Sequence, residues 1–318
     1  MALLERNAVL VSLVSVLGSS IVLACGAPTD DSSSDAPASA SQSIIGGTTV
    51  GVDTIGTPYL WNDWNVGGLC SATLLSDGWL LTAQHCVTQE GVPNGGTTVS
   101  PTYLYVSLLN GGQVRGSSAW TIYLHPTRDI ALVNYAYTAS LRNSADRPWS
   151  TPLYLGNSSD FVGKTVLCQG WGTSTCTSGG GVLRSASIPV TSAYEGTISG
   201  LTDSGKSAST NIKGIKFSRT SALPWLGDSG SSCFAFVEGQ WNVISVDSIG
   251  TAQLDQNGNC VAATDSYHNG VEAFRDWAEG IMGNALTVFA DAAFGGATQQ
   301  LLPGGPSPYF DMLLGATI

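Results

Sequence analysis

The chain has 318 residues, of which 43% are hydrophobic, 11% are charged and 39 are glycine. That length supports a full-sized hydrophobic core, and a glycine-rich, charge-poor composition favours β-strands joined by many turns. The formal net charge of −11 argues against nucleic-acid binding, because an acidic surface repels a phosphate backbone.

The first predicted element is a signal peptide over residues 1–25. An uncharged, mostly apolar run extends from Ala8 to Ala24, after Arg6. The sequence Val22-Leu23-Ala24-Cys25 resembles the end of a bacterial lipoprotein signal, in which cleavage leaves the cysteine as the lipid-carrying N-terminus. We therefore expect an extracytoplasmic protein, secreted or lipid-anchored through Cys25 to a bacterial outer membrane. A permanent membrane-spanning helix over the same run is the alternative.

The second predicted element is a disordered tether or propeptide over residues 26–43. It is rich in Ser, Ala, Asp and Pro and has almost nothing apolar to bury. A lipid anchor followed by a flexible stalk forms a coherent pair.

Four segments after the tether carry residues suited to nucleophilic catalysis. The first reads Ile-Ile-Gly-Gly over residues 44–47, and the second ends an apolar strand with Thr-Ala-Gln-His-Cys over residues 82–86. In the third, Asp129 leads the apolar strand 130–133, and the fourth reads Gly-Asp-Ser-Gly over residues 227–230. A serine hydroxyl is a poor nucleophile until an adjacent base takes its proton, and a carboxylate can orient that base.

In this order the four segments resemble the chymotrypsin-like serine peptidase family, over residues 44–280. His85 and Asp129 are 44 residues apart and Asp129 and Ser229 are 100 apart, both compatible with the family. The resemblance implies an all-β fold of two six-stranded antiparallel Greek-key barrels with a C-terminal helix. It also implies a catalytic triad in which His85 is the base, Asp129 orients it and Ser229 is the nucleophile.

The resemblance assigns further roles around the triad. The amides of Gly227 and Ser229 are expected to form the oxyanion hole, where each donor is worth about 3–4 kcal/mol in the transition state. Cleavage before Ile44 is expected to free an amine that pairs with Asp228, so the protein is expected to be made as a zymogen. The residue before that cut is Ser43, which argues against an activator of the trypsin type.

The specificity pocket is predicted from three positions. Leu223, six residues before Ser229, is the expected floor, and Ser245 is expected to back the triad and begin the substrate-pairing strand. Asp247 is expected along the pocket wall. An apolar floor favours a hydrophobic or small side chain at P1, the substrate residue before the scissile bond. A basic P1 side chain stays an alternative, because Asp247 could admit it from the side.

The seven cysteines predict three disulfides and an oxidising compartment, because Cys25 lies in the signal peptide and leaves six. The resemblance implies the pairs Cys70–Cys86 and Cys168–Cys233, which leaves Cys176–Cys260 as the third. Trp225 stands where the family has a cysteine that braces the specificity pocket. That departure puts substrate preference in doubt more than mechanism.

Residues 284–318 are predicted to form a separate β segment. Phe289 followed by Gly296-Ala297-Thr298 resembles the opening of a βγ-crystallin Greek-key motif. The Ca²⁺-binding part of that motif is not visible, so no metal is assigned. A β-hairpin packing onto the peptidase is the alternative.

The sequence thus predicts a serine endopeptidase that acts on proteins or peptides through an acyl-enzyme. It needs no cofactor, and its expected partners are an activating protease and, through a lipid at Cys25, a membrane. One alternative is a non-catalytic peptidase homologue that serves as a surface binding protein. Another is a protein whose segment 284–318 binds carbohydrate or wall polymer.

Overall fold

A computed structural model covers the chain. It describes residues 44–64, 68–76, 78–93, 95–109, 113–135, 141, 151–202 and 206–283, and the backbone of 286–289 and 298–301. The chain divides into two units, residues 1–39 and 40–318, and every described residue belongs to the second. The predicted signal peptide and tether lie outside the described residues and stay predictions. Within the described part of the chain, no helix has the length and apolarity that a membrane span requires.

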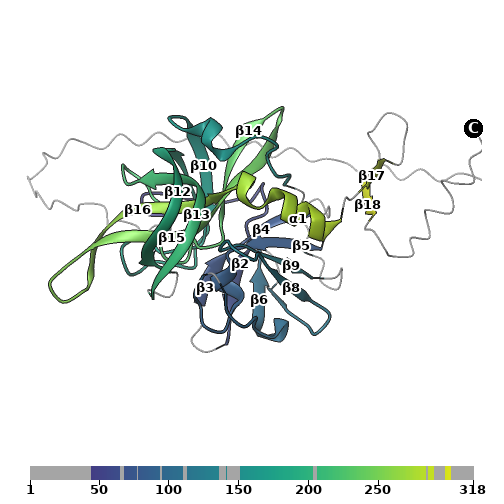
Figure 1. Cartoon of the computed structure of the whole chain (residues 1–318), viewed down its shortest axis with the longest axis horizontal. Coiled ribbons are helices and arrows are strands. Elements are labelled where there is room, and N and C mark those ends of the chain that lie inside the picture. Colours follow the sequence, from purple (N-terminus) through teal and green to yellow (C-terminus); the bar gives the residue numbers. More distant parts are fainter. Residues whose placement is uncertain are drawn as a thin grey trace, which may run out of the picture. The chain divides into compact units, whose positions relative to one another are not determined.

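The N-terminal half forms two four-stranded antiparallel sheets with the strand orders β3-β2-β6-β7 and β4-β5-β9-β8 (Figure 1). Burial alternates along β2 and β6, as expected for strands with one face on a core. Leu60, Leu80 and Val106 belong to that core and are fully buried. The strands are β2 (Tyr59–Asn62), β3 (Gly68–Ser71), β4 (Thr73–Ser76), β5 (Trp79–Thr82), β6 (Leu104–Ser107), β7 (Gln113–Arg115), β8 (Thr121–Leu124) and β9 (Ala131–Asn134).

The C-terminal half forms an eight-stranded sheet with the order β1-β11-β10-β14-β15-β12-β13-β16. An additional pairing of β15 with β16 closes part of this sheet on itself. Ile188, Ile215 and Phe217 lie in its core. The strands are β1 (Thr48–Thr49), β10 (Thr165–Gly170), β11 (Arg184–Pro189), β12 (Ser192–Leu201), β13 (Ser207–Ser218), β14 (Ser232–Val237), β15 (Gln240–Leu254) and β16 (Cys260–Gly270).

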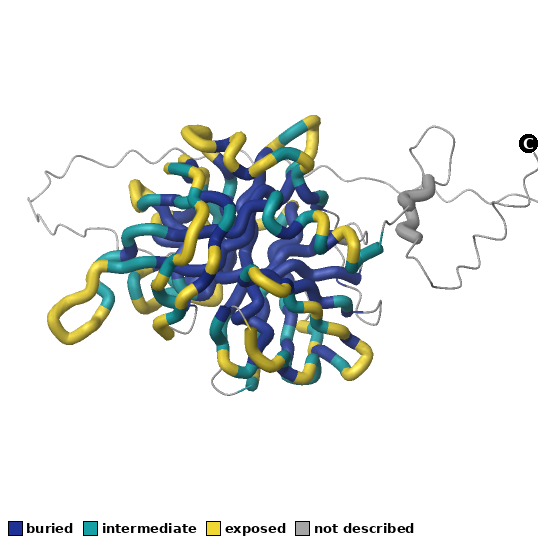
Figure 2. The backbone as a smooth tube through the Cα atoms, in the orientation of Figure 1, coloured by how far each residue is buried: buried dark blue, intermediate teal, exposed yellow. Residues whose placement is uncertain are grey.

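A third apolar cluster joins the two halves. It contains Leu81 of β5, Phe234 of β14 and Ala278 of the C-terminal helix α1 (Arg275–Met282). The resulting interior appears as the continuous buried backbone at the centre of the body in Figure 2. The prediction of an all-β, two-barrel fold with a C-terminal helix is therefore confirmed.

Short 3₁₀ turns connect several strands. They are η1 (Gln84–Val87), η2 (Pro101–Tyr103), η3 (Ser158–Phe161) and η4 (Val271–Ala273). Three disulfides have the predicted pairing, Cys70–Cys86, Cys168–Cys233 and Cys176–Cys260. The first closes a short loop that ends in η1, the second joins the neighbouring strands β10 and β14, and the third ties the loop at Cys176 to the start of β16.

The segment after α1 contains an antiparallel pair of strands, β17 (Leu286–Phe289) and β18 (Thr298–Leu301). Their register pairs Leu286 with Leu301 and Phe289 with Thr298. The intervening residues, Gly296 among them, lie outside the described residues. The resemblance to a βγ-crystallin motif therefore stays a prediction.

Candidate active site

His85 lies in η1, just after strand β5 ends, and is held there by a buried carboxylate. Its Nδ1 lies 2.8 Å from Asp129 Oδ2, and its backbone N–H donates to Asp129 Oδ1 at 3.0 Å. The antiparallel pairing of β5 with β9 places Thr82 opposite Ala131. That register brings the segment after β5, which carries His85, beside the segment before β9, which carries Asp129, although the two residues are 44 positions apart.

Asp129 is fully buried, and a third donor completes its coordination. Ser248 Oγ donates to Asp129 Oδ2 at 2.6 Å. A buried charge needs hydrogen-bonding partners, and this carboxylate has three. With Nδ1 of His85 donating to Asp129, the other ring nitrogen, Nε2, is the basic one.

The prediction that Ser245 backs the triad is wrong, because Ser248 takes that place. Ser245 Oγ instead lies 3.3 Å from Nδ1 of His268. Strand β15 has a register shift between Asp247 and Ile249, and Ser248 is the residue at that irregularity. Spacing alone does not distinguish two serines three positions apart in one strand, so sequence reasoning missed Ser248.

The turn that carries Ser229 lies against the segment that carries His85. The Ser71 N–H donates to the Ser229 carbonyl at 2.9 Å, and the same carbonyl lies 3.5 Å from Cys86 Sγ. The next residue, Gly230, has φ +81°, and a Cβ there would lie 2.1 Å from Thr82 Oγ1. Only glycine permits this close approach of the serine turn to the end of β5.

The same turn presents two backbone amides. Asp228 N–H donates to the Trp225 carbonyl at 2.8 Å, whereas the N–H groups of Gly227 and Ser229 have no acceptor among the described residues. Gly227 adopts φ +89°, a conformation that side chains other than glycine rarely take. Both amides can therefore donate to a bound group, and their role as an oxyanion hole stays a prediction.

Asp228 is fully buried, and its carboxylate accepts three backbone hydrogen bonds. The N–H groups of Gly172 and Trp225 donate at 2.7 and 2.9 Å, and the backbone of Ile44 is the third donor. Burial raises the pKa of Asp228 to about 8. Ile44 is also fully buried and has φ +42°, which is unfavourable for a β-branched residue. The two predicted members of the activation pair are therefore in contact, with a neutral amide in place of an amine.

A small, largely enclosed cavity opens beside Ser229. It has about 10 Å³ of room for the centre of a water molecule, which is space for roughly one water. The Trp225 indole lies on Gly250, where a Cβ would come within 2.3 Å of its ring. The lining residues are Leu201, Pro224, Trp225, Leu226, Ser229, Asp247, Ile249, Gly250 and Ser266.

The cavity bears on two of the residues predicted for the specificity pocket. Asp247 lines its wall. Leu223 does not form its floor: this side chain is fully buried in the core of the C-terminal sheet, and its backbone bridges to Ile45. Pairing with the N-terminal segment therefore turns Leu223 away from the cavity.

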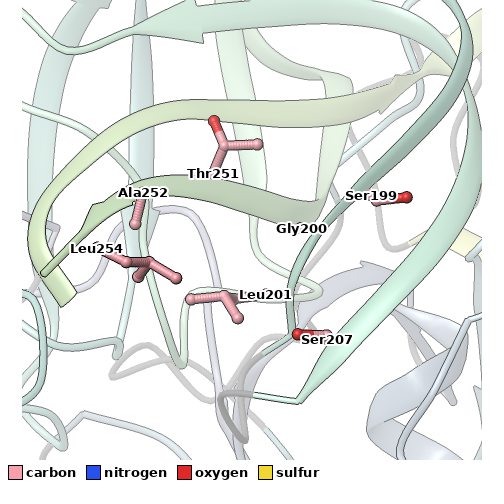
Figure 3. A pocket seen from close by; sticks show the side chains of 7 residues that line it. All are labelled: Ser199, Gly200, Leu201, Ser207, Thr251, Ala252 and Leu254. Carbon is pink, nitrogen blue, oxygen red and sulfur yellow. The ribbon is translucent and has the colours of Figure 1, made fainter. Parts of the chain in front are cut away.

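A wider hollow of about 280 Å³ lies next to this cavity and shares Leu201 with it (Figure 3). Leu201, Ala252 and Leu254 give it an apolar surface. Leu201 of β12 also pairs with Gly250 of β15, whose other edge pairs with Ser266 of β16. The β12 strand thus bounds one side of the site.

The side chains of Cys70, His85 and Cys86 come together closely enough to suggest metal ligands, with their ligand atoms within 4.8 Å of one another. Cys70 and Cys86 are joined in a disulfide, so neither supplies a thiolate. The cluster positions His85 rather than forming a metal site.

A family model described as Trypsin matches residues 45–277, more than two thirds of the 318-residue chain. The matched region contains His85, Asp129 and Ser229, and it ends before β17 and β18.

Proposed function

The chain belongs to the trypsin family, and on that premise we propose that it is a serine endopeptidase. The family acts on protein or peptide substrates. The observation that carries the proposal is the hydrogen-bonded set of His85, Asp129 and Ser248 beside the packed turn of Ser229. Asp129, just before β9, binds the imidazole of His85, and Ser248 in β15 of the other sheet binds Asp129.

In the proposed mechanism, Ser229 Oγ attacks the substrate carbonyl carbon while His85 Nε2 takes its proton. Asp129 and Ser248 keep the imidazole in the required tautomer and stabilise the imidazolium. The Gly227 and Ser229 amides donate to the oxyanion, at about 3–4 kcal/mol each. His85 then protonates the leaving amine, and water hydrolyses the acyl ester with His85 again as base.

The zymogen proposal is supported by the state of Ile44 in the intact chain. Its positive φ costs about 1–3 kcal/mol for a non-glycine residue. Cleavage before Ile44 removes that constraint, because a chain end has no φ to maintain. It also replaces a neutral amide with an ammonium group next to the Asp228 carboxylate, and opposite charges stabilise each other strongly when buried.

The proposed location is extracytoplasmic. Three disulfides in the described residues support an oxidising compartment. Anchoring to a bacterial outer membrane through a lipid on Cys25 is the finer proposal, and mass analysis of the processed N-terminus tests it.

The second candidate is a non-catalytic homologue that binds protein at the cell surface. The narrow cavity beside Ser229 favours it, because a bulky P1 side chain has no room there. A fluorophosphonate probe distinguishes the two functions. We expect the processed protein to be labelled on Ser229 and a Ser229→Ala variant of the same fold to remain unlabelled. An unlabelled processed protein with native stability would leave the binding function as the better assignment.

A further inference from the structure

A buried polar group lies at the inner wall of the cavity beside Ser229. Asp247 Oδ1 accepts from Ser266 Oγ at 2.7 Å and lies 3.1 Å from His268 Nε2. Ser245 Oγ lies 3.3 Å from the other ring nitrogen of His268, and Phe217 packs against the ring. His268 is fully buried, and Asp247 is only 4% exposed. These contacts fix the orientation of the carboxylate.

Within the described part of the chain, only one oxygen of that carboxylate has a partner. Both contacts of Asp247 use Oδ1, and Oδ2 accepts no hydrogen bond from the described residues. Oδ2 is also not fully enclosed by other protein atoms, and Asp247 lines the cavity. Oδ2 therefore opens onto the cavity that also borders Ser229. A carboxylate oxygen in so enclosed a place is an acceptor that gains from a donor.

The cavity limits the donor to a short side chain. It has space for about one water, and its walls are the Trp225 indole, Pro224 and Ile249. Lysine, arginine and the aromatic residues are too long to enter while Trp225 lies on Gly250. Alanine fits but brings no donor, so it leaves Oδ2 unpaired.

We propose that this cavity is the P1 subsite and that it selects serine, whose hydroxyl donates to Asp247 Oδ2. The inference rests on the proposed endopeptidase function and names its substrate class. Asp247 is then the residue that determines specificity, held in place by Ser266 and His268. The P1 preference comes from the side wall of the subsite and not from its floor.

The chain itself carries such a substrate, because Ser43 directly precedes Ile44. In the proposed reaction the bond that is cut belongs to a second copy, and because Ile44 is buried in the folded chain, the N-terminal segment of that copy must first leave the protein body. Ser229 forms an ester with the Ser43 carbonyl, the Ser43–Ile44 bond breaks, and His85 passes the proton to the departing Ile44 amine. Water then hydrolyses the ester to a Ser43 carboxylate. The activating protease is thus another molecule of the same protein.

The test uses the processed protein and a set of peptides based on residues 40–47 (ASQSIIGG), with Ser, Ala, Lys or Phe at the position of Ser43. We expect kcat/KM for Ser to exceed that for Ala by about tenfold to a hundredfold, the value of a hydrogen bond to a charged acceptor. Lys and Phe peptides should not be cleaved. Equal rates for Ser and Ala, or a preference for Lys or Phe, would overturn the assignment.

Labelling of Ser229 separates this inference from the proposed function. A protein that reacts with a fluorophosphonate at Ser229 but cleaves none of the peptides is a peptidase with a different P1 subsite, which overturns the assignment. If Ser229 does not react with the fluorophosphonate, the proposed peptidase function itself is contradicted.

Two variants locate the preference. Asp247→Ala should lower the Ser-to-Ala ratio to about one while Ser229 still reacts with the probe. The matched control is Asp265→Asn in the same strand β16 that carries Ser266: its carboxylate pairs with Lys216 at 3.0 Å, outside the cavity, so its ratio should stay as in the wild type. An unchanged ratio in Asp247→Ala contradicts the proposal. If that variant does not fold, the wild-type peptide ranking decides.

Discussion

The pH dependence of the stability of the uncleaved chain tests the zymogen proposal. Burial raises the pKa of Asp228 from 3.8 to about 8. Between these values the folded precursor keeps a proton on Asp228 that the unfolded chain has already released. The unfolded state therefore binds fewer protons, and the free energy of unfolding falls as the pH rises.

The size of the effect follows from the two pKa values. The difference between 3.8 and about 8, at about 1.4 kcal/mol per pKa unit, corresponds to about 6 kcal/mol in total. About 4 kcal/mol of this is lost between pH 5 and pH 8. Cleavage before Ile44 brings an ammonium group to the carboxylate, which lowers the pKa of Asp228. The processed protein should therefore lack most of this fall.

Denaturant unfolding at pH 5 and pH 8 measures the effect in a full-length Ser229→Ala precursor, which cannot process other copies. The matched control is the same precursor with Asp228→Asn, whose carboxamide does not titrate. The difference between the two slopes isolates Asp228 from every other titrating group. The reasoning is refuted if the Ser229→Ala precursor loses no more stability between pH 5 and pH 8 than the control that also carries Asp228→Asn.

Two further predictions concern the geometry around the triad. Ser248→Ala removes the 2.6 Å hydrogen bond to Asp129 and should lower kcat/KM about tenfold to a hundredfold, with denaturant unfolding showing a folded protein; an unchanged rate would show that Ser248 does not position the triad. Gly230→Ala should destabilise the fold by several kcal/mol and abolish hydrolysis, because its Cβ would lie 2.1 Å from Thr82 Oγ1, whereas Gly239→Ala, with φ +83° and open space, should cost only about 1 kcal/mol. Equal losses in the two glycine variants, measured by denaturant unfolding, would count against the packed turn.

The features that could be predicted from the sequence are those encoded in local patterns. The apolar run over residues 130–133 predicts a strand after Asp129, and β9 (Ala131–Asn134) lies there with its first three residues buried. The motifs around His85, Asp129 and Ser229 are also local, because each residue sits at a strand end or a glycine turn. Two of the disulfide pairs follow from the family resemblance that these motifs carry, and the third pair joins the two cysteines that remain.

The features that could not be predicted depend on register between distant strands. The irregularity in β15 at Ser248 is decided by how β15 pairs with β16, and a shift of one residue reverses the face that each side chain points to. Leu223 likewise does not line the cavity, because its backbone pairs with Ile45, 178 positions earlier in the chain. The contacts of Asp247 Oδ1 could not be predicted for the same reason, since Ser266 and His268, which make them, lie in another strand.

Trp225 illustrates how one substitution changes a pocket in two ways. Read from the sequence, it replaces a bracing cysteine and leaves the specificity pocket without support. In the structure its indole Nε1 donates to the Cys176 carbonyl at 3.0 Å, and Cys176 is bonded to Cys260 at the start of β16. The hydrogen bond and the disulfide therefore connect Trp225, in the wall of the cavity, to β16, the strand that carries Ser266. The indole that makes this link also lies on Gly250, so the same residue that replaces the brace limits the length of the side chain that reaches Asp247.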